Sequence, residues 1–250
     1  ADMQSRQPPG SSAAAPQAGT EDAMLAARAR VLSNPGVDVL RQWLAQPQGT
    51  AFATLEPVRQ AAVLYAAALA ASELREPAAA RKLLARLLES VRSDAPALRQ
   101  AQLLSAEVEL AAGQPEAALR ALPTSSGRPE LLLRARALLQ TPRARLKGDA
   151  EMAQVAGRLQ TRVATQPQDG GAWQLLASVW QAQGQGLRAV RAEAEAHAAR
   201  YDYAAAVDRF KAGQDLARSS HAPGDFVEAS IIDTRLRALQ SLLREQAAER

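Results

Sequence analysis

Side chains that could act as nucleophiles, proton shuttles or metal ligands are few in this chain. It has no cysteine and only two histidines, His197 and His221, among 250 residues. A zinc site needs three or four suitable ligands, and a Ser-His-Asp relay needs a histidine beside a serine and a carboxylate. Neither histidine lies in an HExxH sequence, the pattern of a zinc-binding helix. The sequence therefore predicts no catalytic residue, no metal site and no cofactor in this chain.

A pair of carboxylates close to His197 could in principle serve as general acid and base. These are Glu193 and Glu195, which are two residues apart. Residues at that spacing on a helix point to different faces. We therefore predict no acid-base pair here, and we expect His197 to pack or to make a simple polar contact.

The charge balance is mildly basic. Lys and Arg number 30 against 26 Asp and Glu, which gives a formal charge of +4 that is spread along the chain. This argues against a nucleic-acid partner, which would call for a basic patch. The densest cluster could dock an acidic protein segment or anionic lipid headgroups, although a solvated helix face is the interpretation we favour. It contains Arg134, Arg136, Arg143, Arg145 and Lys147.

The composition favours helices. Apolar residues make up 47% of the chain and aromatic residues only 4%, with many alanines, and no segment alternates in the manner of a strand. The longest apolar stretch, 61–71, is shorter than the roughly 18 residues that a membrane-spanning helix needs. We therefore expect an all-α protein without a transmembrane segment.

Proline and glycine divide the chain into segments. Residues 1–19 are rich in Pro, Ser, Gly and Ala, and they predict a flexible linker at the end of an upstream domain. Residues 20–250 are predicted to form one helical repeat domain that begins at a helix capped by Thr20. About twelve helices are expected, over 21–33, 37–46, 52–74, 77–92, 96–112, 115–122, 129–140, 145–165, 171–183, 187–200, 203–219 and 226–248.

A repeat of 38 residues relates two of these segments. Ala80 corresponds to Ala118 at this offset, and the pairs Ala68 with Ala106 and Leu84 with Leu122 keep it. A period of this length is typical of helix hairpins that cover their apolar faces by stacking on one another. The predicted fold is an all-α superhelix of stacked antiparallel helix hairpins.

A more specific pattern follows Pro167. It reproduces the tetratricopeptide spacing W-x2-L-A-x2-W-x3-G-x4-A. Large residues in this pattern are expected to fill space between helices, the alanines to allow close approach, and the glycine to lie in the turn. The matching positions are Trp173, Leu176, Ala177, Trp180, Gly184 and Ala189.

Both ends of the chain carry a further likeness. Segments 1–6, 27–32, 172–200, 202–214 and 225–236 resemble the C-terminal half of bacterial β-barrel assembly-enhancing proteases of the BepA type. The likeness is strong after about residue 167 and weak between 47 and 162. Members of that family are periplasmic zinc metallopeptidases followed by a tetratricopeptide domain.

This resemblance implies a role in outer-membrane protein assembly and quality control, with the repeats contacting the assembly machinery, its substrates or their own peptidase domain in a chaperone-like way. It also implies a periplasmic location, and it places the zinc and the catalysis in an upstream peptidase domain. This chain would be the binding half. The alternative is a freestanding tetratricopeptide adaptor or chaperone with no peptidase attached.

The repeat register also suggests where a partner binds. In tetratricopeptide arrays the first helix of each unit lines the concave surface, so its polar residues outside the packing positions are candidates. Gln174, Ser178 and Gln181 follow Trp173 at helical spacing and share one face. The same register in earlier repeats indicates Glu107 and Tyr65.

Overall fold

The computed structural model describes residues 19–33, 36–146, 148–219 and 225–248. The predicted linker therefore lies outside the described residues, apart from Gly19. The chain divides into two compact units, Ala1–Ala101 and Gln102–Arg250, whereas the sequence predicts one repeat domain over 20–250.

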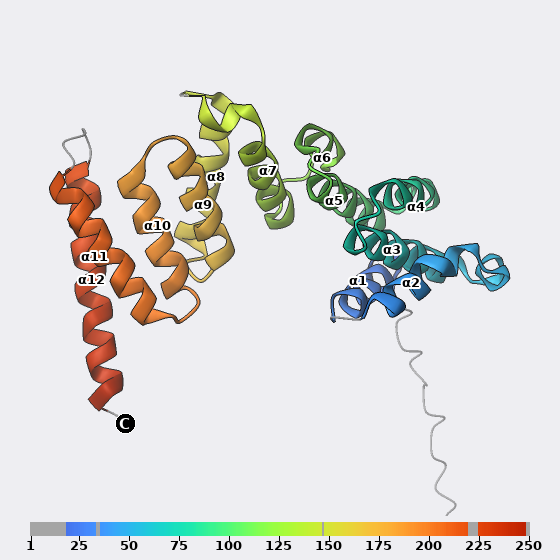
Figure 1. The fold of residues 1–250 in the computed structure, drawn as a ribbon, viewed down its shortest axis with the longest axis horizontal. Coiled ribbons are helices and arrows are strands. Elements are labelled where there is room, and N and C mark those ends of the chain that lie inside the picture. The colour runs from blue at the N-terminus through green and yellow to red at the C-terminus, as the bar shows by residue number, and fades with distance from the viewer. Residues whose placement is uncertain (1–18, 34–35, 147, 220–224, 249–250) are drawn as a thin grey trace, which may run out of the picture. The chain divides into compact units, whose positions relative to one another are not determined.

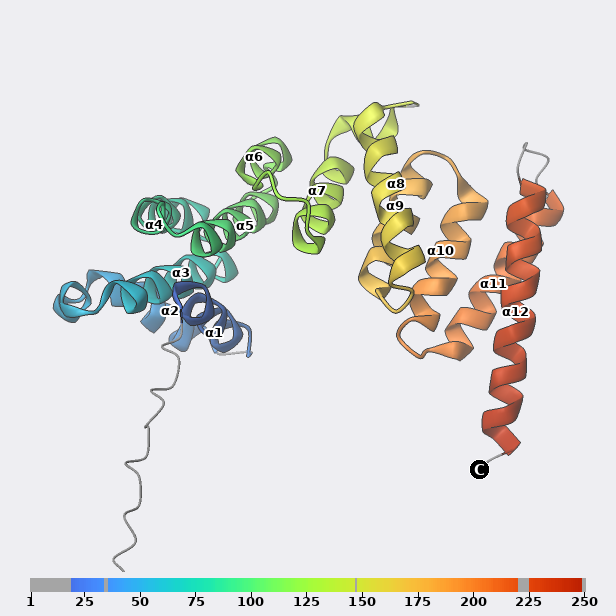
Figure 2. The same cartoon turned by 180° about the vertical axis from the view of Figure 1, so that it is seen from behind.

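The first unit is a stack of consecutive helices. Its order is α1 (Thr20–Leu32), α2 (Val37–Ala45), two 3-10 turns (Gln46–Gln48 and Thr50–Thr54), α3 (Pro57–Glu73) and α4 (Pro77–Ser90), and α5 (Ala95–Ala111) begins near its end. Helix α3 packs against α1, α2 and α4. Figure 2 shows α1 in front of α3. Because α3 is surrounded, its alanine-rich sequence is buried along most of its length.

The second unit continues in the same manner. After α5 come α6 (Pro115–Ala121), α7 (Arg128–Gln140), a 3-10 turn (Pro142–Arg145), α8 (Ala150–Thr165), α9 (Gly170–Ala182), α10 (Gly186–Ala198), α11 (Tyr203–Ser219) and α12 (Asp225–Ala248). Each of the helices from α9 to α12 packs on the next, as Figure 1 shows. The twelve helices and the lack of any strand among the described residues confirm the all-α prediction of stacked helix hairpins.

Two predicted helices begin later than expected. Helix α3 starts at Pro57 rather than at residue 52, and Leu55 and Glu56 are extended. The reason is that a residue before proline is pushed out of the helical region. Helix α8 starts at Ala150 rather than at 145, because Gly148 has a φ of 76° and the Asp149 side chain caps the helix by accepting the Met152 N–H at 3.0 Å.

The start of α1 also differs from the prediction. Gly19 is the capping residue, and Thr20 is the first residue of the helix. The Asp22 carboxylate accepts the Gly19 N–H at 3.3 Å. This bond satisfies the capping residue itself, whereas the Thr20 hydroxyl was expected to accept an N–H of the first turn. Glu21 and Asp22 lie in the first turn, as expected, where negative charge favours a helix N-terminus.

Four interhelix turns share one backbone geometry. Arg75, Gly113, Gly184 and Tyr201 have φ values of 62°, 70°, 75° and 63°. In each turn the next residue donates its N–H to the carbonyl five positions earlier, at 2.8 to 3.1 Å. This is the Schellman arrangement, which satisfies the last carbonyls of a helix and needs one left-handed residue. Arg75 and Gly113 are 38 residues apart, so the turn repeats with the period found in the sequence.

We expect opposite effects on stability when alanine replaces a turn glycine and a helix glycine of the second unit. Gly184→Ala places a Cβ on a residue with positive φ and should lower the free energy of unfolding by about 1 kcal/mol. Gly157→Ala lies inside α8, where an added Cβ meets nothing within 4 Å, and should raise it by about 0.5 to 1 kcal/mol. Urea unfolding of both variants measures these changes. A loss of stability in Gly157→Ala as large as in Gly184→Ala would contradict the assignment of the turn.

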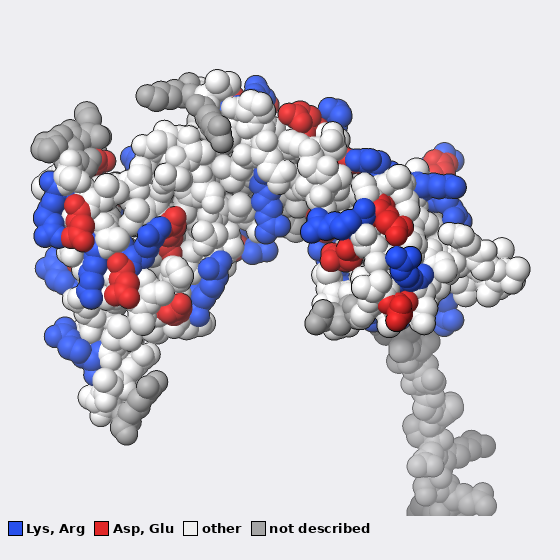
Figure 3. Space-filling model, viewed as in Figure 1, with Lys and Arg blue, Asp and Glu red and all other residues white. Residues whose placement is uncertain are grey.

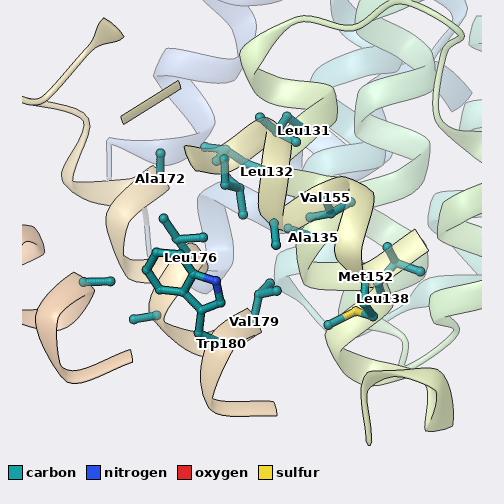
Figure 4. Packing of buried hydrophobic residues seen from close by; sticks show 14 of the residues in the cluster. Leu131, Leu132, Ala135, Leu138, Met152, Val155, Ala172, Leu176, Val179 and Trp180 are labelled. Carbon is teal, nitrogen blue, oxygen red and sulfur yellow. The ribbon is translucent and has the colours of Figure 1, made fainter. Parts of the chain in front are cut away.

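The main core of the second unit lies between α7 and α10. Figure 4 shows the indole of Trp180 among buried aliphatic side chains, with Leu176 beside it. Trp180 is 2% exposed. Trp173 is only half-buried at the edge of this cluster, and its indole N–H donates to the Pro167 carbonyl at 3.0 Å. Both tryptophans were predicted to fill space between helices, and Trp180 therefore contributes more to the core than Trp173 does.

Ion pairs join α12 to α10. The Glu195 carboxylate is buried and accepts two hydrogen bonds from Arg235, at 2.6 and 2.7 Å. This pairing raises the pKa of Arg235, because the carboxylate stabilises its charged form. Glu228 is also buried, and its carboxylate lies 3.1 Å from Arg191 and 3.4 Å from Arg188. The last helix is thus held both by its apolar face and by charged contacts.

Candidate functional site

The face of α9 predicted to bind a partner is accessible. Gln174 and Gln181 are exposed, and Ser178 is half-buried, with its hydroxyl donating to the Gln174 carbonyl at 3.1 Å. The opposite face of α9 carries Leu176 and Trp180 into the core. Figure 3 shows a largely uncharged surface over α9, whereas charged side chains gather over α10, α11 and α12. We call Gln174, Ser178 and Gln181 the α9 polar stripe.

The two other predicted contact residues differ from each other. Glu107 is half-buried on α5. Tyr65 is 1% exposed, so its prediction as a partner-binding residue is wrong. The reason is that α1 packs on this face of α3, and Arg28 of α1 donates a hydrogen bond to the Tyr65 hydroxyl at 3.2 Å. The repeat register placed Tyr65 on the right helix but could not show that another helix covers it.

The predicted basic cluster is only partly gathered in space. Arg134 is half-buried and Arg136 is exposed; two residues apart on α7, they point in different directions. Arg143 lies 3.2 Å from Asp149 and 2.8 Å from Glu151, so its charge is paired. The side chain of Arg145 and the whole of Lys147 lie outside the described residues. A single basic patch is thus not assembled by the part of the cluster that is described.

The carboxylates near His197 serve structural roles. Glu193 pairs with Arg209 of α11, whereas Glu195 pairs with Arg235 of α12. Their directions differ, as their spacing predicts. His197 makes a polar contact, since its Nδ1 lies 3.5 Å from an Asp202 carboxylate oxygen. His221 lies outside the described residues.

Asp169 joins three helices of the second unit. Its carboxylate accepts two hydrogen bonds from Arg128 of α7, at 2.7 and 2.8 Å, and one from Arg162 of α8 at 2.7 Å. It also caps α9 by accepting the Ala172 N–H at 3.1 Å. The Arg128 hydrogen bonds, with those from Arg162 and Ala172, hold the pKa of Asp169 well below its usual range, although burial opposes them. The hydrogen bonds between Arg128 and Asp169 also raise the pKa of Arg128.

An open apolar groove lies between α1 and α3 in the first unit. Its volume is about 660 Å³. A smaller pocket of about 130 Å³ continues it toward Trp43 of α2, since the two share Arg30, Ala62 and Val63. We call the larger feature the α1/α3 groove. Its walls are Ala23, Ala26, Ala29, Arg30, Leu55, Arg59, Ala62 and Val63.

Both charged residues that line the α1/α3 groove are arginines. Arg30 and Arg59 are exposed, and among the described residues neither guanidinium has an ion pair or hydrogen bond. The acids at the start of α1 are already engaged, because Glu21 accepts a hydrogen bond from Gln100 at 2.7 Å and Asp22 accepts one from Gly19. The groove therefore combines an apolar floor with unpaired positive charge.

The sequence predictions did not include this groove. A signal for it exists in α1, which is apolar on two faces. Met24 and Val31 are buried against the unit, whereas Leu25 and Leu32 are 40% and 51% exposed. An amphipathic surface helix would carry polar residues at the exposed positions. Apolar residues on both sides of a first helix thus indicate a second surface to be covered.

Other site types find no support in the described part of the chain. No group of three or more His, Cys, Asp or Glu residues there is arranged to hold a metal ion. None of the described helices combines the length and hydropathy that crossing a membrane requires. No protein-family model matches the chain, and the search of curated proteins found no match.

Proposed function

We propose that this chain is a protein–protein interaction module, the tetratricopeptide-like repeat domain of a periplasmic β-barrel assembly-enhancing zinc metallopeptidase. Its partners would be outer-membrane assembly components or their substrates, and the zinc and proteolysis would belong to an upstream domain. The observation that carries the proposal is the series of stacked helix hairpins with one shared turn geometry, in which the second unit exposes an uncharged polar stripe.

The burial pattern supports a binding role for α9. The apolar positions of the tetratricopeptide spacing, among them Leu176, Ala177 and Ala189, are at most 1% exposed. They are used in packing, so the residues between them on the outer face of α9 serve no packing purpose apart from half-buried Ser178. Exposed amide side chains such as Gln174 and Gln181 supply hydrogen bonds to a partner at a modest desolvation cost.

The proposal predicts that changes on the α9 polar stripe weaken partner capture without unfolding the chain. Ser178→Arg combined with Gln181→Glu should reduce crosslinking to purified outer-membrane β-barrel assembly components about tenfold, because it adds bulk and charge to the contact surface. Helix content and melting temperature should stay unchanged.

The matched control carries the same kinds of change on α8, as Gln154→Arg with Gln160→Glu, both at exposed positions. It should capture as well as the unmodified chain. Capture that survives the α9 changes but disappears when Arg134, Arg136 and Arg143 are replaced by glutamine would move the contact to the basic cluster. No capture by the unmodified chain would contradict the proposed function itself.

A further inference from the structure

Helix α1 carries apolar residues on its outer face as well as on the face packed into the first unit. Leu25, Ala29 and Leu32, at spacings of four and three, are exposed, whereas Met24 and Val31 are buried. An amphipathic surface helix would carry polar residues at the exposed positions. The outer face of α1 therefore offers apolar surface to a further element.

The α1/α3 groove lies beside this apolar face. The lining residues of α1 run from Ala23 to Arg30, which is about 10 Å along the helix axis, or two turns. Alanine walls leave room for larger side chains of an occupant. A helix that inserts apolar residues at i, i+3 or i+4, and i+7 matches a groove of this kind.

Charge decides which occupant fits. Arg30 on the α1 side and Arg59 on the α3 side have no acidic partner among the described residues. A bound segment with carboxylates flanking its apolar stripe would pair with both. Such pairs add specificity and speed association by electrostatic attraction.

The chain itself offers no equivalent occupant. A second copy docked symmetrically would bring the same patch from both copies together, and its arginines would repel those of its partner. Residues 1–18 have Met3 as their one large apolar side chain, and their charged residues are Asp2 and Arg6. Neither source combines large apolar side chains with net negative charge.

We propose that the α1/α3 groove binds an amphipathic, acidic helical segment of a partner protein. This inference rests on the proposed function, since it names a second contact surface of the same interaction module. It assigns Arg30 and Arg59 to the flanks of the bound helix, and Ala26, Ala29 and Ala62 to the floor on which its apolar side chains lie.

The test uses a fluorescein-labelled synthetic helical peptide with leucines at i, i+3, i+4 and i+7 and glutamates beside them. Fluorescence anisotropy should show saturable binding to the full chain that weakens with added salt. Arg30→Glu with Arg59→Glu should weaken binding about tenfold or more, because attraction becomes repulsion. Ala26→Trp should weaken it to a similar extent by filling the groove.

The controls lie on α4 of the same unit. Lys82→Glu makes the same kind of charge reversal at an exposed position, and Ala85→Trp adds the same bulk at an exposed alanine. Both should bind the peptide as the unmodified chain does. A peptide with lysines in place of the glutamates should not bind. Because the chain has no cysteine, a dye on an Ala29→Cys variant reports occupancy of the groove alone.

Several outcomes would overturn the assignment. These are an absence of saturable peptide binding, equal binding of the lysine and glutamate peptides, or binding that the groove variants leave intact. Dimerisation of the chain that Ala26→Trp abolishes would make a second copy the occupant. Binding to anionic phospholipid vesicles that Arg30→Glu with Arg59→Glu removes, without peptide binding, would make the surface a lipid contact. In each case capture through the α9 polar stripe would remain a separate measurement, so the proposed function would stand or fall independently.

Discussion

Replacing Trp180 by alanine is expected to lower the free energy of unfolding by about 3 to 5 kcal/mol, the usual cost of truncating a buried tryptophan. Its indole is 2% exposed and lies in the cluster formed by α7 to α10. The Arg191 guanidinium lies 5.8 Å from the centre of the ring, and this contact is lost as well. Equilibrium unfolding in urea, followed by circular dichroism, measures the change.

Trp173→Ala is the matched comparison on the same helix. Trp173 is half-buried, so its truncation should cost less, about 1 to 2 kcal/mol, including the hydrogen bond to Pro167. Equal losses for the two variants would contradict the different burial of the two side chains. A loss below about 1 kcal/mol for Trp180→Ala would contradict the placement of this side chain in the core.

Replacing Asp169 is expected to have the second largest effect. Asp169→Ala removes the cap of α9 and leaves Arg128 and Arg162 without their carboxylate. A lost cap costs about 1 kcal/mol, and the partly exposed ion pairs add to it, so the total should be about 2 to 3 kcal/mol. Asp169→Asn keeps a capping oxygen and should cost about half as much.

The pH dependence separates the charge from the cap. The pKa of Asp169 is lowered in the folded protein, so its ionised form stabilises the fold at pH values above about 4, the pKa of an unfolded aspartate. That contribution is lost as the pH falls below about 4 toward the folded value. The difference in unfolding free energy between the unmodified chain and Asp169→Asn should be constant from pH 7 to 5 and should narrow by pH 3. A difference that stays constant to pH 3 would contradict the ion-pair assignment.

The sequence was sufficient for the positions of most helices, because helix signals are local. Apolar spacing and the prolines at Pro77, Pro115 and Pro129 predicted helices whose ends lie within two residues of those observed. The two errors at 52–74 and 145–165 arose where Pro57 and Gly148 interrupt the helix. Both interruptions depend on neighbouring residues, so the signal for each is present in the local sequence.

The candidate site was predictable only in part. The α9 polar stripe followed from the spacing around Trp173 and Trp180, because one helix determines which residues share a face. The burial of Tyr65 could not be predicted in this way, because it depends on packing against α1. The contacting residue of α1, Arg28, lies 37 residues earlier in the chain. The α1/α3 groove depends on the same packing and was missed for the same reason.

By itself, the sequence determined the all-α class, the helix hairpins, the 38-residue repeat and the small set of residues able to do chemistry. Periodicity, proline and glycine act over a few residues, and they specify which side of each helix is apolar. Only the tertiary structure decided which helix covers each apolar side, which carboxylate pairs with which arginine, and where Arg30 and Arg59 remain unpaired beside an apolar groove. Those outcomes depend on contacts between segments distant in the chain. A local pattern, such as the apolar residues on two faces of α1, indicates that a surface is to be covered but does not specify what covers it.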